Sequence, residues 1–189
     1  NITRERVRQV EEVALAMIKK SDAYKAEQAI FEEIKNLIHS LGGVISESEL
    51  LSHISGDKSV QNHIHFYLTL GDAFKKHRED DHFHARFSVD DEMVEKVHDS
   101  LKKLYASLGD EDLISETEMI KRFFDQMKDI AEKYKNEEIA KRWLRMSKKI
   151  SKNPLGEWGK TSSPNIHTRG VKDYAFLIMR KHGSPMHFK

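Results

Sequence analysis

The sequence predicts a mainly α-helical protein with small β-wings, organised as tandem winged helix-turn-helix repeats. Three observations favour this fold class. Apolar residues recur at helical spacing along most of the chain. A short segment that begins at Val44 returns in similar form at Leu113, an offset of 69 residues. Each copy stands between an amphipathic helix and further helical and β-prone segments, as a duplicated winged helix requires.

The first expected element is a helix that begins at Arg4, because Thr3 is a suitable N-cap residue. Its apolar residues recur at spacings of three, four and three, and we expect this face to pack: Val7, Val10, Ala14 and Met17. Another face presents guanidinium, carboxylate and amide groups near the helix start, from Arg4, Glu5, Arg6, Arg8 and Gln9. Groups of these kinds read base edges in the major groove of DNA.

The first repeat, residues 23–89, has the element order of a winged helix. Its amphipathic first helix ends at Gly42-Gly43. Ser46 with Glu49 forms a capping box, which predicts the start of a second helix. A polar turn at Asp80-Asp81 separates two expected strands. The expected bounds are 24–40 and 59–70 for the first and third helices, and 73–79 and 82–89 for the strands.

The second repeat, residues 90–168, carries a second capping box, Ser115 with Glu118. Asn136 is expected to cap the last helix of this repeat, and a turn over 153–159 then leads into a wing. The expected helices cover 91–107, 117–134 and 137–151.

A final unit, residues 169–189, begins with a helix over 169–180 that stops near Gly183. A β-like piece follows up to Phe188, and we interpret this unit as the start of a truncated winged helix. We expect its helix to pack onto a neighbour within the chain or to swap between chains, so a homodimer through the terminal helices is one expected assembly.

A specific motif stands in the N-terminal segment, residues 1–22: Thr3-Arg4-Glu5-Arg6-Val7-Arg8-Gln9-Val10-Glu11. It resembles the recognition helix in the fourth region of bacterial primary sigma factors, which reads the upstream promoter element. The resemblance implies DNA contacts by Arg4, Glu5, Arg6, Arg8 and Gln9. The sequence departs from that family because the supporting first helix of the helix-turn-helix does not precede Asn1. A salt-bridged surface helix is the alternative interpretation.

The C-terminal unit carries a second resemblance. Gly170-Val171-Lys172-Asp173 and Gly183-Ser184-Pro185-Met186-His187-Phe188 resemble the opening of HARE-type winged helices, a family similar to the N-terminal domain of the RNA polymerase delta subunit. Gly156-Glu157-Trp158-Gly159, with Ile166 and Arg169-Gly170, resembles the linker that precedes such modules in sigma-like proteins. The resemblance implies a role in transcription or on DNA and no catalytic residue.

The net charge of +1 conceals an asymmetry, with a balance of −7 over residues 1–136 and +8 over residues 137–189. A basic C-terminal part predicts a surface that faces a polyanion. We expect Arg142, Arg145 and Lys148 to share one stripe of the helix over 137–151. The candidates for salt-dependent phosphate contact are Lys141, Arg142, Arg145, Lys148, Lys149, Lys152 and, with Trp158 in the wing, Lys160. The alternative for the basic part is a solvated face without a partner. The acidic part before it is an alternative binding surface, which would face a basic protein.

Several function classes are disfavoured. The absence of cysteine excludes disulfides and thiolate metal sites and fits a reducing cytoplasm. No run approaches the roughly 20 apolar residues of a membrane span, so no membrane partner is expected. No phosphate-binding loop, nucleophile elbow or metalloprotease motif is present, so we expect neither an enzyme nor a cofactor.

The histidine-rich segment 77–84 raises the question of a metal. His77, His82 and His84 with Asp80 and Asp81 form a conceivable zinc site, but we expect an exposed wing without metal. The third helix of the first repeat is poor in cations, and we expect it to contact protein rather than DNA.

These observations together predict a DNA-binding protein of bacterial transcription, located in the cytoplasm with the nucleoid. Double-stranded DNA is the expected partner, with RNA polymerase as a second. Two alternatives stay open: a scaffold that binds RNA polymerase or other proteins without touching DNA, and a DNA-reading accessory module of a modification or restriction system.

Overall fold

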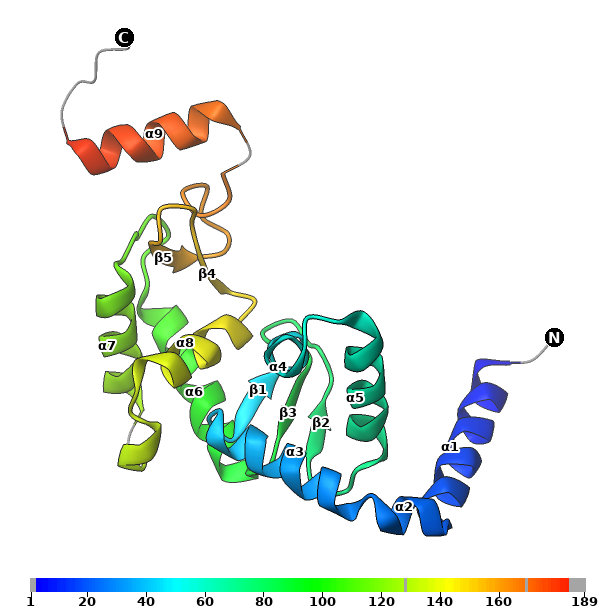
Figure 1. Ribbon diagram of the computed structural model, residues 1–189. Coiled ribbons are helices and arrows are strands. Elements are labelled where there is room, and N and C mark those ends of the chain that lie inside the picture. The colour runs from blue at the N-terminus through cyan, green and yellow to red at the C-terminus, as the bar shows by residue number, and fades with distance from the viewer. Residues whose placement is uncertain (1–2, 128, 169, 184–189) are drawn as a thin grey trace.

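Figure 1 shows the computed structural model, which describes residues 3–127, 129–168 and 170–183. The protein is mainly helical, with 61% helix and 10% strand, and its sheets are small and antiparallel. Two packed units follow one another along the chain, and one helix extends from the body at each end (Figure 1). No helix within the described ranges is long and apolar enough to cross a membrane.

The N-terminal helix, α1 (Arg4–Lys20), begins where the sequence predicts, since the Thr3 side chain accepts a hydrogen bond from the Arg6 amide at 3.2 Å. The expectation that its apolar face packs is wrong for the described residues, none of which is buried in this helix. Val10 is 55% exposed and Met17 is 69% exposed. The partly buried Leu15 packs against the core of the first unit and Lys19 pairs with Asp72, whereas the first turns of α1 extend away from the body (Figure 1).

The first unit joins six elements in the order helix, strand, two helices, two strands. A short helix, α2 (Asp22–Ala26), precedes them, because the helix predicted over 24–40 breaks at Glu27. Their bounds are α3 (Gln28–Ser40), β1 (Val44–Ser46), α4 (Glu47–Ile54), α5 (Lys58–Leu70), β2 (Lys75–His77) and β3 (Arg86–Ser88). The strands form one antiparallel sheet in the order β1-β3-β2, and Ile45 pairs with the fully buried Phe87 at its centre.

The second unit has a similar order of elements, with the isolated bridge residue Ile114 where the first unit has β1. Its elements are α6 (Asp91–Ser107), α7 (Glu116–Gln126), a 3-10 turn η1 (Glu132–Tyr134), α8 (Glu137–Met146), β4 (Ile150–Lys152) and β5 (Trp158–Lys160). Strand β5 pairs with β4 and also exchanges two backbone hydrogen bonds, of 2.8 and 2.7 Å, between Trp158 and Ile114. The last strand therefore lies between the other two β segments, as β3 does in the first unit.

The predicted N-caps form, but the capping boxes are incomplete among the described residues, since Glu49 pairs with Arg145 and Glu118 with Arg122 instead. Ser46 and Ser115 each accept a hydrogen bond, at 3.4 Å, from the amide three residues later. Asn136 accepts one from Ile139 at 2.9 Å and starts α8. These side chains satisfy amides that have no partner within the helix.

Several predicted boundaries are wrong. The helix predicted over 117–134 ends at Gln126, and that predicted over 137–151 ends at Met146. The strands are shorter than predicted because residues 78–85 leave the sheet and contact the second unit. There the Lys148 amide donates to the His82 carbonyl at 2.7 Å, and the His84 amide donates to the Met146 carbonyl at 3.0 Å. These bonds join distant segments of the same chain, and they pair the backbone groups of Met146 and Lys148 outside the helix, so α8 does not continue.

The C-terminal helix, α9 (Val171–His182), extends from the far end of the second unit (Figure 1). Leu177 is its one buried residue in the described range. The helix ends at Gly183, whose φ of 70° is the left-handed conformation that favours glycine at a helix end. The β-like piece predicted for residues 184–188 lies outside the described residues.

Candidate nucleic-acid interface

The five side chains predicted to read DNA lie on one exposed helix, α1, and four of them, Glu5, Arg6, Arg8 and Gln9, are linked by hydrogen bonds. Arg8 donates to both carboxylate oxygens of Glu5, at 2.7 and 3.0 Å, and also pairs with Glu12. Gln9 donates to Glu5 at 3.2 Å. Arg6 donates to Gln9 at 3.5 Å. Hydrogen bonds from Arg8 and then Gln9 hold the pKa of Glu5 below its ordinary value. The face is thus a row of charged and amide groups that order each other in solvent.

Arg4 completes this row and makes no ion pair or hydrogen bond through its side chain with any described residue. No other element covers the polar face of α1 within the described ranges. The geometry offers donors and acceptors on the first turns of a helix, the part that enters a major groove in helix-turn-helix proteins.

The basic residues of the second unit are arranged differently, because α8 lies between the two units rather than on an open face. Its residues Trp143 and Leu144 are fully buried, and α8 packs against β1 of the first unit. Gly42 allows this approach: a Cβ there would lie 2.9 Å from both Ile139 and Trp143. The φ of 119° at Gly42 is also one that other residues rarely adopt.

Carboxylates of other elements neutralise the cations of α8. Arg145 Nη1 lies 2.9 Å from Glu49 Oε1 on α4, and Arg142 Nε lies 4.0 Å from the same oxygen. Lys141 lies 3.4 Å from Glu116 and 3.2 Å from Glu138. The predicted stripe of Arg142, Arg145 and Lys148 does not form, since Lys148 follows the end of the helix. Helix α8 is therefore an internal joint of the protein.

The remaining predicted cations are paired in the same way, with one exception. Lys148 donates to Glu79 at 2.7 Å, Lys152 to Glu116 at 2.6 Å, and Lys160 to Asp110 at 2.7 Å. The hydrogen bond to Glu79 raises the pKa of Lys148, and that to Asp110 raises the pKa of Lys160. Lys149 alone among these seven has no ion pair with a described residue.

This pairing explains the charge asymmetry of the sequence. The positive balance after residue 136 meets acidic side chains of the preceding part, and the partners are Glu49, Glu79, Asp110 and Glu116. Sequence reasoning missed these four counter-ions. No local signal identifies them, because Arg145 and Glu49 are 96 residues apart.

The histidine-rich segment is mostly exposed, as predicted, but the buried Phe83 anchors it to the second unit, and we call residues 78–85 the clasp. Phe83 is buried and stacks on His98 of α6, with ring centroids 4.2 Å apart. The buried Arg86 donates to His98 Nε2 at 2.8 Å and to Asp80 Oδ2 at 3.2 Å. Burial raises the pKa of Asp80, but bonds from the amides of His82 and Phe83, together with Arg86, outweigh it and hold that pKa below its ordinary value.

Burial first, and then the neighbouring Arg86, lower the pKa of His98 to about 4. His98 is therefore a neutral acceptor near pH 7. His77 contacts Ser88 Oγ at 2.8 Å rather than a shared ion. Within the described ranges, no three His, Cys, Asp or Glu side chains are grouped to hold a metal.

Large apolar side chains are exposed on both terminal helices. On α1 they are Val7, Val10, Val13 and Met17, and on α9 they are Val171, Tyr174, Phe176, Ile178 and Met179. Stripes of this kind mark surfaces that contact other molecules.

Comparison of the chain with protein-family models, with curated proteins and with solved structures finds no match.

Proposed function

We propose that the protein binds double-stranded DNA through α1 and acts in bacterial transcription in the cytoplasm. One observation carries the proposal: the polar side chains of the first turns of α1 are exposed, contact each other, and are free of the body. Arginine pairs with guanine, glutamine with adenine, and glutamate accepts from cytosine. The resemblance of this segment to the sigma recognition helix supports the same role.

We further propose that both units are winged helices in tandem. The order helix, strand, two helices and two strands, with the last strand central, supports this in the first unit. In the second unit the isolated bridge of Ile114 with Trp158 takes the place of the first strand. In the second unit the third helix, α8, is buried against β1, and its cations are paired. We therefore propose that the pair of units carries α1, and that α8 is not a second reader of DNA.

Duplex binding tests this proposal. Fluorescence anisotropy of a labelled promoter-like duplex, and of a scrambled duplex of equal length, is measured over a range of salt concentrations. We expect affinity to fall with salt, with a logarithmic slope of about −0.9 for each phosphate that is neutralised. Replacing Arg4 and Arg6 with Ala reduces that slope and the preference for the promoter-like duplex. Lys20→Ala, at the exposed far end of the same helix, is the matched control.

A scaffold that binds protein is the second candidate function, favoured by the exposed apolar faces of α1 and α9. An apolar helix stripe of this kind binds a second amphipathic helix. To separate the scaffold from the DNA reader, binding to purified RNA polymerase is compared between the wild-type chain and the V10E/M17E variant. If the polymerase binds the wild-type chain but not this variant, and no duplex binds at low salt, the scaffold replaces the DNA reader.

A further inference from the structure

The apolar face of α1 follows a heptad pattern and is exposed along its length. Its residues alternate at spacings of three and four, as the a and d positions of a coiled coil do, and we call them the seam: Val7, Val10, Ala14 and Met17. A groove runs along this face, and its lining is apolar apart from Arg6 and Gln9. The sequence pattern is that of a face that packs, but the described body of the chain does not cover it.

The seam lies on a side of α1 that does not face the first unit. Leu15 packs against the core of that unit and Lys19 pairs with Asp72, so the side of the helix that carries these two residues faces the body. Successive residues are rotated by about 100° around a helix, which places Val10 and Met17 on another side. A partner therefore reaches the seam without displacing the body.

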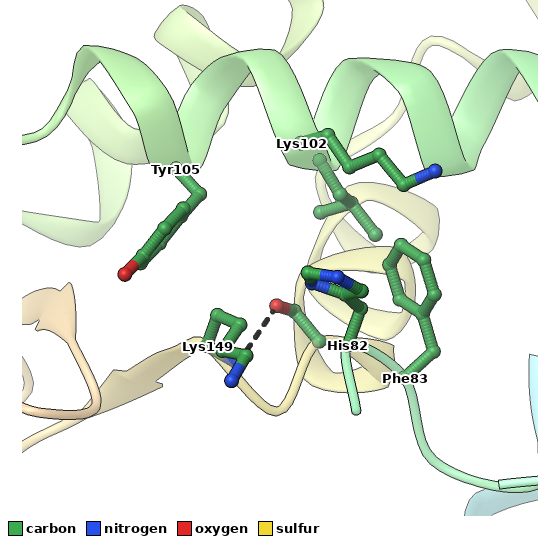
Figure 2. A pocket seen from close by; sticks show the side chains of 7 residues that line it. His82, Phe83, Lys102, Tyr105 and Lys149 are labelled. Atoms are coloured by element: carbon green, nitrogen blue, oxygen red, sulfur yellow. Dashed lines mark hydrogen bonds between the residues drawn. The ribbon is translucent and has the colours of Figure 1, made fainter. Parts of the chain in front are cut away.

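The two pockets that touch the clasp do not suit an apolar helix face. The pocket between α6, the clasp and the turn after α8 measures about 120 Å³, and the His82 ring lies between Tyr105 and Phe83 within it (Figure 2). The pocket between α4, α5 and the clasp has charged groups in its lining: Glu47, Lys58 and Glu79. Neither pocket of a second chain would therefore receive the seam.

The residues beside the seam fit a second copy of α1 in parallel orientation. Residues at the e and g positions flank the seam of a coiled coil and pair between its helices. In a parallel pair, each g residue faces the e residue of the next heptad on the other helix. Arg6 then lies beside Glu11 of the second copy, and the exposed Val13 lies beside Ile18. Neither Arg6 nor Glu11 has an ion pair with a described residue of its own chain.

The antiparallel arrangement places like charges together. It brings Val7 of one helix opposite Met17 of the other. Each Glu11 then lies beside the other Glu11, and each Arg6 lies beside Lys20. Like charges placed side by side across an interface disfavour that arrangement. The charges of α1 thus favour the parallel pair over the antiparallel one.

We propose that two copies of the chain associate through a parallel pairing of their α1 helices along the seam. The inference gives the expected homodimer a surface and an orientation, and it does not rest on duplex binding. A seam of two heptads is short, so we expect the association to be weak and to depend on protein concentration. Glu5, Arg8 and Gln9 stay on the outer side of the pair, whereas Arg6 is used by both proposals.

Sedimentation velocity of the full chain, over a wide range of protein concentration, tests whether the seam associates. We expect the mass of the wild-type protein to rise from that of one chain toward that of two. The V10E/M17E variant is expected to stay monomeric, because it places charges in the seam at positions that are exposed in the single chain. A wild-type protein that stays monomeric, or a variant that associates as the wild type does, overturns the inference.

An exchange of charges tests the pairing of Arg6 with Glu11. Glu11→Lys places like charges on both flanks of the seam, and we expect it to weaken association by about tenfold. The R6E/E11K variant restores opposite charges and is expected to restore most of that loss. Glu12→Lys is the matched control, because it makes the same change of charge at the next residue, on the outer side of the pair. An exchange that restores nothing overturns this pairing.

The absence of cysteine from the sequence allows the orientation to be tested by cross-linking. Met17→Cys places two thiols opposite each other in a parallel pair, and we expect mild oxidation to link them. In an antiparallel pair these thiols would be about 15 Å apart along the helix axis, too far for a disulfide. Glu12→Cys, on the outer side, is the control expected not to link. A chain that associates but does not cross-link at residue 17 overturns the parallel arrangement.

The seam and the DNA reader fail separately. Chains that stay monomeric but bind the duplex overturn the seam and leave duplex binding through α1 in place. Chains that associate according to the charge exchange but bind no duplex at low salt overturn the DNA reader and leave the seam in place. The V10E/M17E variant keeps Arg4, Arg6 and Gln9, so its duplex binding reports on the reader without the seam.

Discussion

Arg145 Nη1 lies 2.9 Å from Glu49 Oε1, and this ion pair joins the last helix of the second unit to the second helix of the first. Arg142 approaches the same oxygen, so one carboxylate holds two guanidinium groups at the joint. The pair helps to explain the charge distribution of the sequence, because cations of the basic C-terminal part meet carboxylates of the acidic part before it.

Glu49→Gln tests this relationship. We expect a loss of about 1 kcal/mol in the free energy of unfolding, because Arg145 is half exposed and such pairs contribute little in water. Urea denaturation measures the free energy of unfolding. The control is Glu32→Gln, which breaks an exposed pair with Lys35 on α3 and is expected to be neutral. An unchanged unfolding midpoint would show that the ion pair does not stabilise the joint.

Gly42→Ala tests the close packing of α8 on the first unit. The added methyl group meets Ile139 and Trp143, and the backbone is held at a φ unfavourable for alanine. We expect destabilisation of about 2–4 kcal/mol, from strain and overpacking together. Gly56→Ala is the matched control, because nothing lies within 4 Å of a Cβ at that position. Equal stability of the two variants would contradict the packing described for α8.

Phe83→Ala tests whether residues 78–85 are a clasp. The ring is buried between the units, so its removal leaves a cavity, with an expected cost of about 3–5 kcal/mol. Phe66→Ala, at a position 49% exposed on α5, is expected to cost far less. Thermal unfolding followed by circular dichroism compares the two. A small effect at Phe83 would mean that the segment is a free wing, as the sequence suggested.

The low pKa of His98 predicts that the stability of the fold depends on pH. Its pKa is about 4 in the folded state and near 6.5 when unfolded, so the unfolded chain binds more protons between these values. Stability is therefore complete above about pH 6.5 and falls as the pH drops toward 4, by on the order of 2–3 kcal/mol. His77, whose pKa burial also lowers, adds in the same direction.

Urea titrations at several pH values measure this slope, and His98→Gln keeps a hydrogen-bond acceptor for Arg86 while it removes the titration. The variant is expected to have a flatter profile over that range. An identical slope in both proteins would assign the pH dependence to other groups.

The sequence allowed the local features to be predicted but not the joint between the units. Helix α6 was expected over 91–107 and is found there, because Asp90 caps it and its apolar face is regular. The caps at Ser46, Ser115 and Asn136 depend only on residues three positions apart, so they too were predictable.

The wrong predictions of element bounds concern segments whose backbone bonds to distant parts of the chain. The end of α8 is set by the bond from Lys148 to His82, which no pattern within the helix reveals. Helical spacing likewise did not show that Glu49 and Glu116 pair with cations of the second unit, and the phosphate contacts of these cations stay a prediction. The reading of α1 as a DNA-contacting helix stays a prediction.

Salt-titrated anisotropy of the R4A/R6A variant beside Lys20→Ala tests the central claim most directly. We predict that a promoter-like duplex binds the wild-type chain and the control with the same salt slope. We predict that it binds the double variant more weakly and with a smaller slope. The same affinity and slope for all three chains, or no duplex binding by the wild-type chain at low salt, would contradict DNA binding through α1.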